Sequence, residues 1–201
     1  MIEVFADVCC PFTHAGLRLL VARRGAASAR LPLRLRAWPL ELVNGAPLDP
    51  DLVAEEIEAL RHGAVPDAFA GFDRSRFPAT SLPALALAAA AYERGVETGE
   101  RVSLALRHAL FEEGRDVADP EVVAAVAADH GLGAPESRHH HAVRADWQEG
   151  RRRGVVGSPH FFAAGSSWFC PVLDIRREDG RMHVATDEGA LDALMAAAAG
   201  G

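Results

Sequence analysis

The chain has 201 residues, of which 49% are apolar and 24% charged, and its formal net charge is −7. This length suits one sizeable domain, or a smaller domain with a large insertion. No apolar run free of charge reaches the roughly 18 residues that a membrane span needs. The excess of acidic residues argues against binding to nucleic acid, so we expect neither a membrane nor a nucleic acid as partner. All 21 basic residues are arginine, which excludes Schiff-base chemistry and a phosphate loop that ends in Gly-Lys-Ser/Thr.

The three cysteines, Cys9, Cys10 and Cys170, are too few for a disulfide framework. No Cys/His quartet has the spacing of structural zinc, and we expect no metal. The first residues, MIEVFAD, lack the basic and apolar pattern of a secretory signal. We therefore expect the chain to be cytoplasmic.

The first third of the chain predicts a strand, a helix and a second strand. Residues 2–6 are apolar and end at Asp7, residues 11–24 have helical spacing, and residues 31–38 alternate leucine with proline or arginine. Four further helices follow, with turn or capping residues at both ends. Their ranges and caps are 49–63 from Asp49, 81–95 from Ser81, 98–114 from Thr98, and 119–131 from Asp119.

The last third predicts a helix, a return to strands and a final helix. The helix covers 137–153, the strands 160–164, 168–175 and 182–186, and the closing helix begins near Asp187. Asp179-Gly180 is a hairpin turn signal between the last two strands.

Without the block of four helices, the order is βαβ followed by αββα. This predicts an α/β fold with a mixed four-stranded sheet, flanked by helices, and a large all-helical insertion. We assign residues 1–48 and 137–201 to the sheet domain and 49–136 to the insertion.

Cys10 lies where a predicted strand passes directly into a helix, followed by Pro11 at the first helical turn. Unpaired N–H groups and the helix dipole favour a thiolate there, so we expect a lowered pKa and nucleophilic chemistry. The alternative is that Cys9 and Cys10 are both small buried apolar residues.

A second signal is GVVGSPHFF at 154–162, where a Gly-Ser-Pro turn leads into an apolar strand. Proline cannot donate to a sheet ladder, so Pro159 must serve another purpose, for which a cis Ser158–Pro159 bond is one candidate.

These features together resemble the DsbA family of thioredoxin-fold proteins. The layout is most similar to the branch with FrnE-like proteins, 2-hydroxychromene-2-carboxylate isomerases and kappa-class glutathione transferases. The motifs that carry the resemblance are CPFT at 10–13, Trp38-Pro39-Leu40, SLPALALAAAAYERG from Ser81, ALFEEGRDVADPEVVAAVAADHGL from Ala109, and GVVGSP at 154–159.

The resemblance implies that Cys10 is the nucleophile and that Pro159 is the cis-proline facing it. Thr13 stands where dithiol members have their second cysteine, so the usual internal disulfide cannot form. Thr13 could instead donate or accept a hydrogen bond. His14 could support a thiolate or move a proton, or it could serve only to cap the helix or to pack.

The predicted binding residues are Pro11, Phe12, Ser158, Pro159 and His160, although strand alternation leaves the direction of His160 open. Trp38 is predicted to be core. A buried thiol is the favoured interpretation for Cys170.

Three functions remain open at this point. The first is a thiol–disulfide oxidoreductase that acts through Cys10 alone, with a small-molecule thiol or disulfide as partner. The second is an isomerase or transferase in which Cys10 or Thr13 activates the thiol of a cofactor. The third is a module that binds thiols or senses redox state without catalysis. No tightly bound cofactor is expected, glutathione or another low-molecular-weight thiol is the candidate ligand, and a homodimer is considered.

Overall fold

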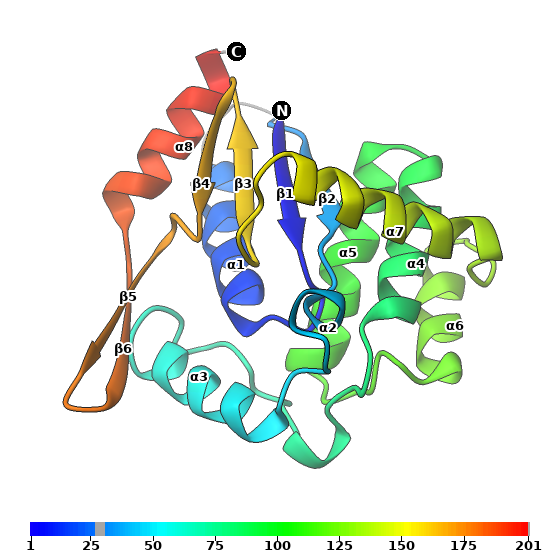
Figure 1. Cartoon of the computed structure of the whole chain (residues 1–201), viewed down its shortest axis with the longest axis horizontal. Helices are drawn as coiled ribbons and strands as arrows, with labels where there is room; N and C mark the ends of the chain where they lie inside the picture. The colour runs from blue at the N-terminus through cyan, green and yellow to red at the C-terminus, as the bar shows by residue number, and fades with distance from the viewer. Residues whose placement is uncertain (27–30, 201) are drawn as a thin grey trace.

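The centre of the molecule is a mixed sheet of four strands in the order β2-β1-β3-β4 (Figure 1). The computed structural model describes residues 1–26 and 31–200. The strands span Ile2–Ala6 (β1), Leu33–Ala37 (β2), His160–Ala163 (β3) and Ser166–Phe169 (β4). β1 is parallel to β2 and antiparallel to β3, which in turn is antiparallel to β4. The predicted thioredoxin fold is confirmed.

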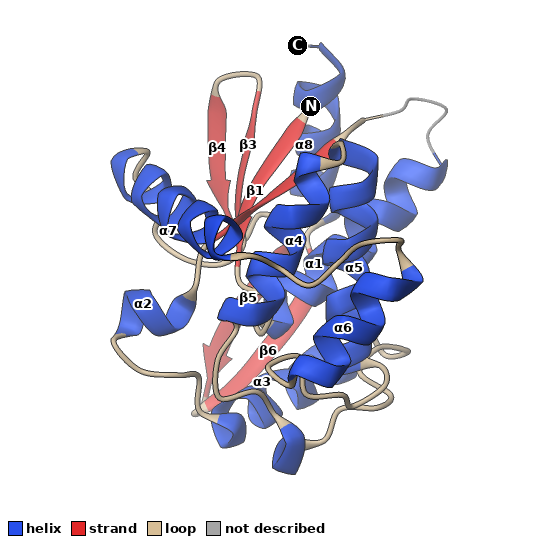
Figure 2. Cartoon of the chain, turned by 90° about the vertical axis from the view of Figure 1, so that its right-hand side faces the viewer, coloured by secondary structure: helices blue, strands red, loops and turns tan. Residues whose placement is uncertain are grey.

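Helices surround this sheet. Six of them lie between β2 and β3 in the sequence, and four of these six fall within residues 49–136, the range predicted as the insertion. The helices are α1 (Pro11–Ala26), α2 (Leu40–Asn44), α3 (Pro50–His62), α4 (Leu82–Glu93), α5 (Val96–Phe111), α6 (Pro120–Asp129), α7 (Ser137–Arg152) and α8 (Glu188–Gly200), with a short 3-10 turn at Arg74–Arg76. Figure 2 shows α4, α5 and α6 grouped beside the sheet.

Two of the four predicted caps of the insertion act as expected. The carboxylates of Asp49 and Asp119 accept hydrogen bonds from backbone N–H groups in the first turns of α3 and α6. The prediction for Thr98 was wrong, because α5 already begins at Val96, after Gly95 at a positive φ of 121°. Ser81 occupies the cap position of α4, but its hydroxyl donates to Asp7 instead of capping the helix.

The alternation of the strands decides which helices cover each face of the sheet. Val4 and Phe161 point to the face covered by α1 and α8, where they share a core with Leu17 and Leu191. On the opposite face, Phe5 packs with aromatic and aliphatic residues that include Trp38, Val155 and, from α7, Trp147. Trp38 is 3% exposed, which confirms it as core.

The predicted strand 168–175 is broken in the structure. The chain leaves β4 at Cys170, which has a positive φ of 46°, and Pro171 follows. The next strands, β5 (Leu173–Glu178) and β6 (Arg181–Thr186), form a separate two-stranded ribbon around the Asp179-Gly180 turn. Pro171 has no N–H group to donate, so the strand ladder of the central sheet stops before it. The hairpin of the central sheet is therefore β3–β4, and β5 belongs to the separate ribbon.

The β5–β6 ribbon packs on α3, and α3 also contacts α1 (Figure 1). The approach is closest at Gly63, where an added Cβ would lie 1.8 Å from the carbonyl oxygen of Val184. Only glycine permits this contact. Helix α3 therefore packs against both the ribbon and the helix that begins beside Cys10.

Candidate active site

Cys10 lies at the turn between β1 and α1, where its carbonyl accepts the first hydrogen bond of the helix from the N–H of His14 at 3.2 Å. Its Sγ donates to the carbonyl oxygen of Ser158 at 3.2 Å. The Ser158–Pro159 peptide bond is cis. The fold thus brings together the two sequence signals, which lie 148 residues apart.

Two buried hydroxyl groups lie beside Cys10. The Oγ1 atom of Thr13 and the Oγ atom of Ser158 are 2.8 Å apart and hydrogen bonded. Ser158 Oγ also accepts from the backbone N–H of Asp7 at 2.9 Å. When Ser158 donates its proton to Thr13, the Thr13 hydroxyl hydrogen is free to point at the Cys10 sulfur. Thr13 therefore completes a polar cluster at the position where a dithiol enzyme has a second sulfur.

The expectation of a lowered Cys10 pKa was wrong for this structure. Cys10 is only 3% exposed, and this burial raises the pKa of its thiol, because an anion loses its hydration there. Hydrogen bonds from Thr13 and Ser158 oppose the increase, while the charge of Glu56 adds to it. Hydrogen-bond donors at the helix end are thus present, but they do not outweigh desolvation.

The predicted binding residues differ in where they lie. Pro11 and Pro159 are buried at the site, whereas Phe12 is half-buried and packs against the core. His160 stacks on Phe162 at 5.0 Å, on the sheet face away from α1, and its Nδ1 accepts from the N–H of Val156. Burial lowers the pKa of His160, and Arg153 lowers it further. His160 therefore holds the backbone of the loop before Pro159 from the sheet face opposite α1.

His14 contacts the helical insertion and not the proline loop. Its Nε2 lies 2.7 Å from Oε1 of Glu112, and its ring packs between Phe69 and Phe111. Burial lowers the pKa of His14, although Glu112 opposes this. Burial alone would raise the pKa of Glu112, but hydrogen bonds from His14 and from the backbone of Phe69 and Ala70 lower it to about 2. The prediction that His14 serves the thiol directly finds no contact to support it among the described residues.

Sequence reasoning missed a buried acid and base next to the cysteines. Asp7 is 1% exposed and accepts from the N–H groups of Cys9 at 2.8 Å and Leu40 at 2.6 Å. Arg107, 2% exposed, donates to the backbone carbonyls of Asp7 at 3.1 Å and Ser103 at 2.8 Å. Burial lowers the pKa of Arg107 to about 10, and the charge of Asp7 opposes this. One available signal was an arginine within the apolar stretch LALRHALF at 104–111.

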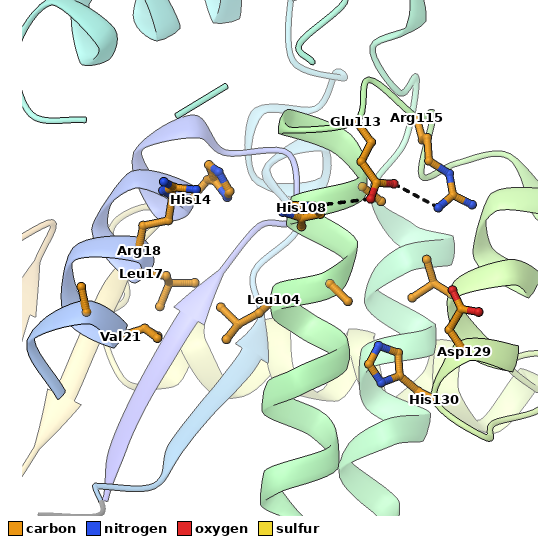
Figure 3. Close-up of a pocket in the computed structure, with 14 residues that line it drawn as sticks. His14, Leu17, Arg18, Val21, Leu104, His108, Glu113, Arg115, Asp129 and His130 are labelled. Atoms are coloured by element: carbon orange, nitrogen blue, oxygen red, sulfur yellow. Dashed lines mark hydrogen bonds and ion pairs between the residues drawn. The ribbon is translucent and has the colours of Figure 1, made fainter. Parts of the chain in front are cut away.

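A cavity of about 580 Å³ lies along α1 and starts one helical turn after Cys10 (Figure 3). Its apolar wall includes Leu17 and Val21 from α1 and Leu104 from α5. Titratable groups at its edge include His108 and His130. This volume is within the usual range for small organic ligands.

The comparison with family models decides the classification. A model described as the DSBA-like thioredoxin domain matches residues 1–174. The chain belongs to this family. Members of the family are oxidoreductases or isomerases. A search of curated proteins found no match.

Solved structures of DsbA-like proteins share the fold at low sequence identity. The cytosolic disulfide reductase DsbM from Pseudomonas aeruginosa with GSH has a TM-score of 0.61 at 16% identity, covering 98% of this chain and 95% of that one. A 2-hydroxychromene-2-carboxylate isomerase gives 0.56 at 17% identity over 84% and 87%. Reduced DsbA1 from Neisseria meningitidis gives 0.51 at 12% identity over 99% and 83%. These likenesses establish the fold, while the chemistry depends on the site itself.

Proposed function

We propose that this chain is a thiol–disulfide oxidoreductase in which Cys10 is the attacking sulfur. The observation that carries the proposal is the 3.2 Å contact between Cys10 Sγ and the carbonyl of Ser158, beside the cis peptide bond to Pro159. A sulfur at a helix start, against a loop whose backbone can pair with a substrate, is suited to exchange with a disulfide.

The reaction needs two exchange steps. The Cys10 thiolate attacks a disulfide R–S–S–R′, forming Cys10–S–S–R and releasing R′S⁻. A second thiolate, R″S⁻, then attacks the sulfur of R, giving R–S–S–R″ and restoring the Cys10 thiolate. Glutathione or another low-molecular-weight thiol would supply R″S⁻, in keeping with a cytoplasmic location, where thiols are kept reduced.

The hydroxyl pair of Thr13 and Ser158 suits the state in which Cys10 is charged. A thiolate accepts hydrogen bonds, so the Thr13 hydroxyl can donate to it while Ser158 donates to Thr13. The carbonyl of Ser158, which accepts from the neutral thiol, favours the protonated form. Release of this contact is therefore part of activation.

Exchange also requires the buried sulfur to become accessible. The charge of Glu56 on α3 acts on Cys10, and α3 packs against both α1 and the β5–β6 ribbon. We infer that a movement of α3 opens the site.

The test is to treat the native reduced protein with a charged alkylating agent from pH 6 to 10 and to identify the modified cysteine by mass spectrometry. Cys10 should react at a rate that increases with pH above 8, and the Cys9→Ala variant should react equally. Cys10→Ala should abolish both alkylation at this position and reduction of a small aromatic disulfide. A Cys10 that reacts only after denaturation would refute the proposal.

A second candidate function is an isomerase or transferase that uses the thiol of a cofactor. The cavity of about 580 Å³ one turn along α1, together with Thr13 in place of a second cysteine, favours it. This candidate gains if the protein binds glutathione tightly but shows no disulfide exchange, and if Thr13→Cys introduces exchange. A homodimer stays a prediction, which light scattering would test.

A further inference from the structure

Cys170 lies beside the same proline loop that Cys10 contacts. The N–H of Cys170 donates to the carbonyl of Pro159 at 2.9 Å, and Cys10 Sγ donates to the preceding carbonyl, that of Ser158, at 3.2 Å. We propose that Cys170 is the resolving cysteine of this protein and forms a disulfide with Cys10 after the first exchange. The inference rests on the function proposed for Cys10.

The two cysteines contact the proline loop at consecutive residues, Ser158 and Pro159. Consecutive Cα atoms are 3.8 Å apart across a trans peptide and about 2.9 Å across a cis one, so the two carbonyls that the cysteines contact are near neighbours. A disulfide needs Cα atoms about 4.4–6.8 Å apart, so the proposal requires Cys10 and Cys170 to reach that separation after the first exchange. His160 pairs with Phe169, so Pro159 and Cys170 face each other one step beyond the end of the β3–β4 ladder.

Electrostatics give independent support for this proximity. Burial raises the pKa of Cys170 to about 12, and the charge of Cys10 is the second cause of the increase. Cys170 is 8% exposed and Cys10 3%. Both cysteines are thus buried, and Cys170 lies near enough to Cys10 for the charge of Cys10 to act on it.

Cys9 is the less suitable partner for Cys10. Adjacent cysteines can form only a strained ring. The groups whose charges act on Cys9 include Asp7, Arg107 and Glu41, and its side chain packs in the core with residues of the insertion. Cys9 therefore belongs to the packing around the buried acid and base.

The resolving step balances without any group beyond those already named. The Cys170 thiolate attacks Sγ of Cys10 in Cys10–S–S–R, the Cys10–Cys170 bond forms, and RS⁻ leaves and takes up the proton that Cys170 lost. Two cysteines are oxidised and the substrate disulfide is reduced to RSH and R′SH. Two equivalents of a low-molecular-weight thiol then restore both cysteines. Cys170 would in this way perform the reaction that Thr13 cannot.

The experiment counts thiolate released from an aromatic disulfide reagent, dithiobis(nitrobenzoate), in the Cys9→Ala background to remove the third cysteine. The Cys10 mixed disulfide releases one equivalent, and resolution by Cys170 releases the second. We expect two equivalents, no remaining adduct, and a Cys10–Cys170 peptide pair by mass spectrometry. With Cys170→Ala in the same background, we expect one equivalent and a persistent Cys10 adduct. The second release should increase about tenfold per pH unit from pH 7 to 9, because the reactive thiolate fraction does.

The outcomes separate the two proposals. One equivalent and a stable Cys10 adduct while Cys170 is present would overturn the resolving role but leave the function of Cys10 intact. Two equivalents from the Cys170→Ala variant would also overturn it. No release from Cys10 in the folded protein would overturn both. Thermal melts of each variant and the Cys170→Ser substitution identify any loss that comes from misfolding.

Discussion

Replacing Thr13 with valine tests whether the hydroxyl cluster both stabilises the fold and activates the thiol. Thr13 is 0% exposed, and its Oγ1 lies 2.8 Å from Ser158 Oγ. Valine has the same shape but no hydroxyl, so the Oγ atom of Ser158 keeps only its bond from the N–H of Asp7. The loss of one buried hydrogen bond costs about 1–2 kcal/mol, or roughly 2–8 °C in Tm for a domain of this size.

The same substitution should slow the reaction of Cys10. The hydrogen bond from Thr13 opposes the effect of burial on the Cys10 pKa. If the hydrogen bond from Thr13 stabilises the Cys10 thiolate by about 1 kcal/mol, its loss lowers the thiolate fraction at neutral pH about fivefold. The assay is the rate of Cys10 alkylation against pH, with Thr13→Ser as the control that retains the hydroxyl. If valine lowers Tm but leaves the alkylation profile unchanged, the hydroxyl has a structural role only, and the reasoning on activation fails.

Two further predictions concern α3, the helix that packs against α1 and carries Glu56. Burial raises the pKa of Glu56 to about 7, so its contribution to stability declines as pH rises from about 4.5 to 7. Glu56→Gln should therefore stabilise the protein at pH 8 by about 1–3 kcal/mol and not at pH 4, as measured by denaturant unfolding. Glu55→Gln, at an exposed neighbouring position, should have a smaller effect on stability at pH 8, because the charge of Glu55 contributes less to the raised pKa of Glu56 than burial does. Equal effects of the two substitutions would contradict the burial argument. Gly63→Ala forces the backbone of β6 away, because the new Cβ would lie 1.8 Å from the oxygen of Val184. We expect a loss of about 1–3 kcal/mol together with faster alkylation of Cys10, whereas Gly133→Ala, with no atom within 4 Å, is the control for both measurements.

Most of the fold follows from local patterns in the sequence. Alternating leucines predicted β2, and Asp-Pro pairs located the starts of α3 and α6. The separate β5–β6 ribbon could not be predicted, because turn signals show that a hairpin forms but not which sheet it joins. The break at Cys170 could be seen in the following proline, yet the positive φ of Cys170 depends on tertiary contacts.

The site was predicted in its parts but not in its environment. The family resemblance implied that the loop of Pro159 faces Cys10, and in the structure the carbonyl of Ser158 in this loop accepts from the Cys10 sulfur. The pKa of Cys10 could not be predicted, since local sequence indicates the hydrogen-bond donors but neither the burial of the sulfur nor the charge of Glu56 on α3, 46 residues away. His14 shows the same limit, because the position of Glu112 depends on how the insertion folds back.

Asp7 has a consequence for how the molecule unfolds. Its groups connect four places in the chain: the start of α1 through Cys9, α2 through Leu40, α4 through Ser81, and the proline loop through Ser158. Neither the sheet domain nor the helical insertion can detach without leaving a desolvated carboxylate short of partners. Both parts should therefore lose their structure in a single cooperative transition, and fragments expressed separately should not reproduce it.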